Sequence, residues 1–158
     1  MSTFRTALIA VVALMLAITG VLVAGGPAQA KTFPPNFKVT TDRPTLADLN
    51  DIVEFLVETP ASDQAKAANV GGGMNAVVVP KTVYSLGLFR APRGWNEVTG
   101  PLVQRGNSVT ATLNSGSVGR PTIMMTVEFK KLDGNWKLSA NSLCQGVKTV
   151  GLNIYCNR

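Results

Sequence analysis

The clearest pattern in the chain is an alternation of apolar and polar side chains on either side of Asp133-Gly134. A period of two is typical of a strand with one buried face, and Asp-Gly favours a two-residue hairpin turn because that turn needs positive φ angles. Such a loop pairs Leu132 with Asn135 and Phe129 with Leu138, whereas a three-residue loop would mix apolar and polar faces. The predicted apolar face of this hairpin consists of Ile123, Met125, Val127, Phe129, Trp136 and Leu138.

The same register extends the second strand to Ala140, opposite Val127. A second hairpin is predicted upstream, with strands over residues 98–105 and 108–114 around a Gly106-Asn107 turn. Its expected apolar face consists of Leu102, Val109, Ala111 and Leu113, with Leu102 opposite Ala111 and Val103 opposite Thr110.

Apolar residues at three- and four-residue spacing predict a helix that begins after Thr45 and ends at Thr59-Pro60. Thr45 and Asp48 have the spacing of a capping box, with Asp in place of Glu. The apolar stripe consists of Leu46, Leu49, Ile52, Val53, Leu56 and Val57, and the opposite, exposed side carries Asp51, Glu54 and Glu58.

Two shorter helices are predicted between this helix and the strands. Ser62 is expected to cap a helix over residues 63–70, which the glycines at 71–73 end. Residues 74–88 allow two interpretations. One is a short helix over 80–86 with Pro80 in its first position, and the other is a single helix that runs through Val77.

Helices first and an antiparallel meander afterwards indicate an α+β fold, with the N-terminal helices packed on one face of the sheet. Residues 43–158 are predicted to form one such domain. Residues 31–42 contain prolines and lack periodicity, so we expect a flexible lead-in. The cysteines Cys144 and Cys156 predict one disulfide, worth about 3 kcal/mol, that ties the C-terminal tail to the end of the last strand.

Residues 1–30 have the pattern of a signal peptide. Arg5 precedes an apolar run over residues 7–23, and Ala28-Gln29-Ala30 resembles a cleavage site. Cleavage after Ala30 predicts a secreted or cell-envelope protein. The alternative is an uncleaved membrane anchor, because the apolar run has nearly the length of a membrane span.

The expected mature chain is basic, since removal of Arg5 leaves 14 of the 15 basic residues against nine acidic ones, a net charge of +5. Outside the cytoplasm this charge favours an anionic envelope polymer or lipid as partner rather than nucleic acid. The alternative is a charge spread over the surface without a specific partner.

The chain contains no histidine, which excludes Ser-His and Cys-His catalysis and ordinary zinc sites. No metal or other cofactor is expected. One catalytic hypothesis remains, in which Tyr84 pairs with Glu97 or Glu128 in an isomerase or dehydratase.

One stretch, residues 89–95, combines two arginines with two aromatic residues. Phe89, Arg90, Arg93 and Trp95 are a candidate contact loop for a phosphate, a carboxylate or a sugar face. Alternatively, Phe89 and Trp95 close one end of the core and the arginines are solvated.

Three segments together, Thr45–Leu49, Ala65–Gly73 and Leu132–Ser139 followed by a cysteine, resemble the secreted low-molecular-weight antigen family of mycobacteria and related actinobacteria. The resemblance covers roughly residues 44–156. It implies a cone-shaped domain similar to nuclear transport factor two or cystatin, and an exported protein of unassigned activity. Some members are recognised by the immune system, and the family has no catalytic residues to transfer.

The leading hypothesis is therefore a secreted, non-enzymatic domain that binds an envelope component or a small apolar ligand. A ligand cavity is expected between the sheet and the first helix, at Met125, Phe129, Trp136 and Leu138. The alternatives are the isomerase or dehydratase and a structural or accessory surface antigen.

Overall fold

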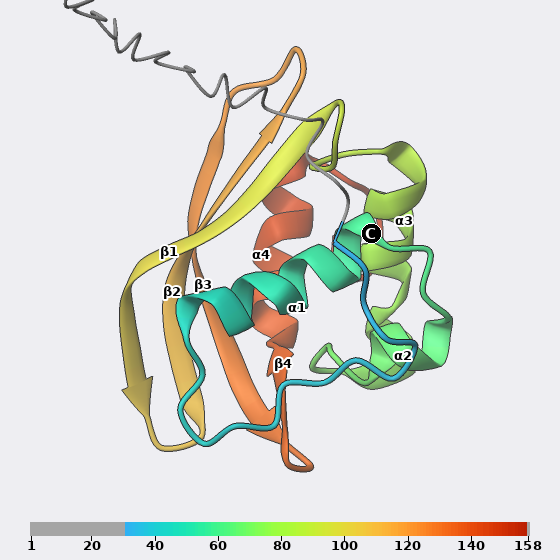
Figure 1. The fold of residues 1–158 in the computed structure, drawn as a ribbon. Coiled ribbons are helices and arrows are strands. Elements are labelled where there is room, and N and C mark those ends of the chain that lie inside the picture. Colours follow the sequence, from blue (N-terminus) through green and yellow to red (C-terminus); the bar gives the residue numbers. More distant parts are fainter. Residues whose placement is uncertain (1–30, 158) are drawn as a thin grey trace, which may run out of the picture.

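The computed structural model describes residues 31–157 of the 158-residue chain, so the predicted signal peptide at 1–30 lies outside the described residues. It confirms an α+β fold with helices packed on an antiparallel sheet of order β1-β2-β3-β4 (Figure 1). The elements are α1 (Leu46–Glu58), α2 (Asp63–Ala67), a 3₁₀ turn η1 (Gly73–Ala76), α3 (Val78–Leu86), β1 (Gly94–Arg105), β2 (Ser108–Ser117), β3 (Ile123–Leu132), β4 (Asn135–Leu138) and α4 (Ala140–Val150).

The β3–β4 hairpin has the predicted register, with Leu132 opposite Asn135 and Phe129 opposite Leu138. Its turn residues have the positive φ angles that the Asp-Gly pair indicated. The expected continuation to Ala140 is wrong. The Ser139 hydroxyl accepts a hydrogen bond from the Ser142 N–H and caps a helix, so the strand ends at Leu138.

The β1–β2 hairpin also has the predicted turn, with Val103 opposite Thr110, but both strands are longer than expected. The register shifts between Thr99 and Val103, so the predicted pairing of Leu102 with Ala111 is wrong. Pro101 lies inside this irregularity, and a proline lacks the N–H that a regular ladder requires.

Helix α1 begins with the predicted capping box. The Asp48 N–H donates to Thr45 Oγ1 at 3.1 Å, and the Thr45 N–H donates to Asp48 Oδ2 at 2.8 Å. Of the buried residues of α1, Leu49, Ile52, Val53 and Leu56 belong to the core, whereas the Phe55 ring packs on Phe33 and Phe37 of the N-terminal segment. Helix α2 ends earlier than expected, and α3 begins at Val78 with Pro80 in its first turn, between the two predicted alternatives.

The largest difference from expectation is α4, because this helix includes Ala140, which was expected in a strand, and residues after Cys144, which were expected in a tethered tail. Leu143 and Val147 bury one side of this helix against the core. Cys144 and Cys156 form the predicted disulfide with an S–S distance of 2.06 Å, but it links α4 to the C-terminal loop instead of to a strand end. The chain end is thereby held beside the helices.

Residues 31–42, the expected flexible lead-in, follow a path that is hydrogen-bonded to the domain. The Val39 N–H donates to Asn135 Oδ1 at 2.9 Å, and Val39 accepts from the Trp136 N–H at 2.9 Å. The indole of Trp136 donates to the Thr41 carbonyl at 2.8 Å. This segment therefore covers the β4 end of the sheet.

Candidate functional site

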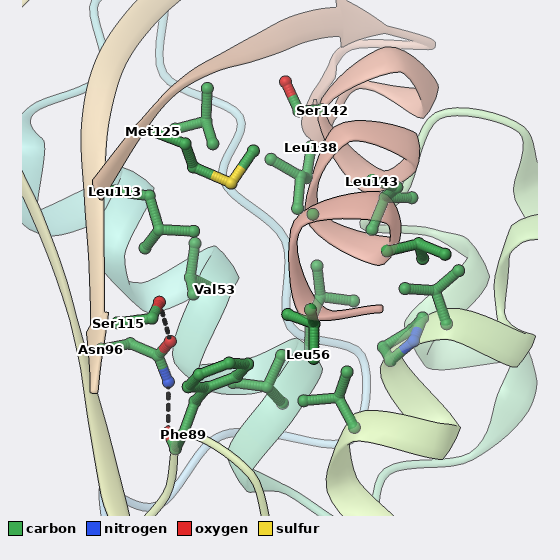
Figure 2. A pocket seen from close by; sticks show the side chains of 18 of the residues that line it. Val53, Leu56, Phe89, Asn96, Leu113, Ser115, Met125, Leu138, Ser142 and Leu143 are labelled. Atoms are coloured by element: carbon green, nitrogen blue, oxygen red, sulfur yellow. Dashed lines mark hydrogen bonds between the residues drawn. The ribbon is translucent and has the colours of Figure 1, made fainter. Parts of the chain in front are cut away.

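An apolar cavity of about 90 Å³ lies between the helices and the sheet (Figure 2). Its walls include Val53 and Leu56 from α1, Val79 and Val83 from α3, Leu113 and Met125 from the sheet, and Leu143 and Val147 from α4. Side chains beside a void lose the dispersion contacts that a packed neighbour would supply. Cavities lined by aliphatic and aromatic side chains can accept small apolar molecules.

Of the four residues expected at a ligand cavity, the structure places Met125 and Leu138 on the lining of this cavity. It places Phe129 and Trp136 elsewhere, fully buried in the filled part of the core. The reason is that β4 is short and pairs only with residues 129–132 of β3. Together with residues 31–42, β4 fills the end of the core that contains Phe129 and Trp136. The cavity lies at the other half of β3, where α4 instead of a strand covers the sheet.

A short chain of polar groups reaches the cavity wall from the end of α1. Ser115 Oγ donates to Asn96 Oδ1 at 2.8 Å, and these two residues face each other across β1 and β2 (Figure 2). Asn96 Nδ2 donates to the Phe89 carbonyl and to Glu58 Oε1, the latter at 3.3 Å. Ser115 falls in the loop predicted after residues 108–114, so the sequence pattern does not reveal this pair. In the regular register that follows from the Gly106-Asn107 turn, Ser115 would lie opposite Val98, and only the shift between Thr99 and Val103 brings it opposite Asn96.

Glu58 was assigned to an exposed helix face, but the structure shows it half-buried. Burial raises the pKa of the Glu58 carboxyl above its usual value, and the neighbouring charge of Glu54 acts in the same direction. The hydrogen bond from Asn96 and the charge of Arg90 lower the pKa and oppose this shift. Glu58 thus carries a partly desolvated charge next to the polar pair of the cavity.

Lys66 is another buried charge, with 1% of its surface exposed. Its ammonium donates to the Leu56 carbonyl at 2.5 Å and to the Thr59 carbonyl at 2.8 Å, so it caps the C-terminal end of α1. Burial lowers the pKa of Lys66 to about 8. Its nitrogen and the Arg90 guanidinium carbon lie over the Tyr84 ring, 5.1 Å and 4.3 Å from the ring centre.

The catalytic pair of Tyr84 with Glu97 or Glu128 is not assembled. Tyr84 meets two cations instead of a carboxylate. Glu97 is exposed on β1, and Glu128 accepts from Ser108 Oγ at 2.7 Å on β3. This geometry removes the basis of the isomerase or dehydratase hypothesis.

The candidate contact loop is divided between the interior and the surface. Phe89 is buried and lines the cavity, and Arg90 lies over Tyr84, whereas Arg93 and Trp95 are exposed. The alternative that both aromatics close the core is wrong for Trp95, which is 45% exposed. Its indole lies against Gly116, where an added Cβ would come within 2.2 Å of the ring nitrogen.

Within residues 31–157, no three Cys, Asp or Glu side chains gather as a metal-ion site. None of the helices in this part of the chain is both long and apolar enough to cross a membrane.

A family model described as low molecular weight antigen MTB12, C-terminal domain, matches residues 42–154. The chain belongs to this family. No curated protein matches the chain. Membership in the MTB12 family confirms the resemblance seen in the sequence. The family is described by its antigenicity, and together with the disulfide this is consistent with an extracellular protein.

Proposed function

We propose that this MTB12-family domain is a secreted, non-enzymatic binding protein that holds a small apolar ligand between its helices and its sheet. The observation that carries the proposal is the cavity of about 90 Å³, whose lining is almost entirely aliphatic and aromatic. A ligand there would regain the dispersion contacts that the lining lacks and would remove its own apolar surface from water.

The chemistry of the lining favours binding over catalysis. Its polar side chains, Asn96, Ser115 and Ser142, hydrogen-bond to other protein groups. General acid–base catalysis needs a titratable group within hydrogen-bond reach of the substrate. The Glu58 carboxyl has a raised pKa, but it is bonded to Asn96 and does not itself line the cavity. The antigen family to which the chain belongs is not described by an enzymatic activity.

The test compares wild type with a variant whose cavity is filled. Leu113→Phe adds volume on the cavity side of β2, and Thr112→Phe adds the same ring on the opposite face of the strand. Toluene is expected to raise the unfolding temperature of wild type and of Thr112→Phe but not that of Leu113→Phe. At tenfold excess over its dissociation constant, a ligand stabilises the wild type by about 1.4 kcal/mol.

Calorimetric titration with toluene gives the second readout. Binding to wild type that Leu113→Phe abolishes supports the proposal. Equal binding by Leu113→Phe, or no binding by wild type, contradicts it and favours the structural or accessory surface role.

A second candidate function, binding of an anionic envelope component, rests on a row of cations across the sheet. Arg105 pairs with Ser108, Ser108 with Lys130, and Lys130 with Lys137, so these side chains share one face. Lys130 and Lys137 have acidic partners at 3.6 Å and 3.1 Å, which reduce the net charge of the row. Salt-sensitive sedimentation with anionic vesicles that Arg105→Gln abolishes would support this function, and no sedimentation at low salt would contradict it.

A further inference from the structure

The polar atoms of the cavity wall can accept a hydrogen bond from a ligand but have no hydrogen left to donate to one. Among the lining residues, Ser142 has little capacity left. Its oxygen accepts from the Glu128 N–H at 2.8 Å and from Ser139 Oγ at 3.1 Å, and its hydroxyl points toward the Glu128 carbonyl at 3.5 Å. Ser142 is therefore occupied in joining α4 to β3.

The pair formed by Ser115 and Asn96 is different, because its donors are used and its acceptors are not. Both hydrogens of the Asn96 amide nitrogen are directed at protein oxygens, those of Phe89 and Glu58. The Ser115 hydroxyl has one hydrogen, which it donates to Asn96 Oδ1. Among the residues that the structure describes, no other donor contacts either of these two oxygens. A serine oxygen has two lone pairs and an amide oxygen also has two, so acceptor capacity remains on both.

We infer that the cavity selects an apolar molecule that carries one hydrogen-bond donor, such as an alcohol or a phenol, and that Ser115 and Asn96 accept its hydrogen (Figure 2). This inference rests on the proposed function, since it concerns the ligand of the same cavity. The rest of the wall is apolar, so the body of the molecule must be hydrocarbon.

The two acceptor oxygens of Ser115 and Asn96 exclude fatty acids and other carboxylates as good ligands. A carboxylate has no hydrogen to donate and would meet two acceptor oxygens. It would also be brought toward Glu58, whose carboxyl lies one hydrogen bond behind Asn96. Burying an ionised group without a donor or a counter-charge is strongly unfavourable.

The experiment compares three molecules of similar shape, toluene, phenol and benzoate, by calorimetric titration of the wild-type domain. Phenol is expected to bind about fivefold more tightly than toluene, because one additional hydrogen bond has roughly that value in a buried site. Benzoate is expected not to bind. Toluene binding equal to or tighter than phenol binding would overturn the inference, as would tight binding of benzoate.

Three variants test whether Ser115 and Asn96 cause the preference for phenol over toluene. Ser115→Ala/Asn96→Ala removes both acceptor oxygens and is expected to bring the phenol-to-toluene ratio toward one while toluene binding persists, which shows that the cavity is intact. Ser115→Thr keeps a hydroxyl and should retain the ratio. Ser117→Ala, on the same strand and off the cavity lining, is the matched control.

A ratio unchanged in Ser115→Ala/Asn96→Ala would overturn the assignment of the acceptor pair. If toluene binds wild type and phenol has no advantage, the proposed function stands and the ligand class does not. If none of the three molecules binds, the proposed function itself fails and the inference fails with it.

Discussion

Lys66 places a positive charge in the interior, where it joins the end of α1 to the Tyr84 ring. Its pKa is lowered to about 8 from the ordinary 10.5, because burial disfavours the ammonium. The charge of Asp63 raises the pKa and opposes this effect, and those of Arg90 and Lys81 lower it further. Between pH 8 and 10.5 the unfolded chain binds more protons at Lys66 than the folded protein, so this residue makes stability rise with pH.

Replacing Lys66 by Met should remove this pH dependence. We expect the free energy of unfolding of wild type, relative to Lys66→Met, to rise by at most about 1.4 kcal/mol per pH unit above pH 8. Urea unfolding at pH 7 to 10 measures the difference. Lys38→Met, at an exposed position, is the control. A difference that does not change with pH would contradict a buried Lys66 ammonium.

At Glu58 the dependence of stability on pH has the opposite sign to that at Lys66. A carboxyl whose pKa is raised by folding destabilises the protein above the raised pKa, and this cost disappears below the ordinary value of 4.5. Glu58→Gln keeps an oxygen that accepts from Asn96 and should raise the unfolding temperature slightly at pH 7. The gain should vanish at pH 4. Glu97→Gln, at an exposed position on β1, should show neither effect. A loss of stability at pH 7 would contradict this account of Glu58.

At the scale of elements, α4 closes the cavity and depends on the disulfide. Leu143 and Val147 form part of the cavity wall, and Cys144 holds the helix to the loop that brings Leu152 to the same wall. The Cys144–Cys156 bond spans 12 residues. A loop of this size corresponds to about 3 kcal/mol in the chain-entropy model.

Removing both cysteines should therefore lower the free energy of unfolding by about 3 kcal/mol and also weaken toluene binding. The measurement is urea unfolding of Cys144→Ala/Cys156→Ala, with wild type in a reducing agent as the matched comparison. Loss of stability without loss of binding would show that α4 holds its position on the cavity independently of the bond.

At the scale of the whole molecule, the sequence predicted what depends on neighbours along the chain. The Asp133-Gly134 turn determined the β3–β4 register, and Thr45 with Asp48 determined the start of α1. These features follow from local backbone chemistry, which a sequence displays directly.

Features that depend on contacts between distant segments were not predictable in the same way. Helix α4 contains Gly146 and several polar residues, so its sequence is not strongly helical. Leu143 and Val147 have a helical spacing, but two residues indicate a helix only once Ser139 is recognised as its N-terminal cap. The position of the cavity follows from where β4 ends and α4 begins, so Phe129 and Trp136 were expected there although the lead-in fills that end of the core.

The central claim, an apolar ligand held between the helices and the sheet, is tested most directly by methyl chemical-shift mapping during a toluene titration. We predict saturable shifts of the methyl groups of Met125, Leu138 and Leu143, which line the cavity. The exposed Met74 and Leu86, on the outer side of the domain, should not respond. Saturable shifts confined to Met74 and Leu86, or no saturable shift at Met125, Leu138 and Leu143, would contradict the account.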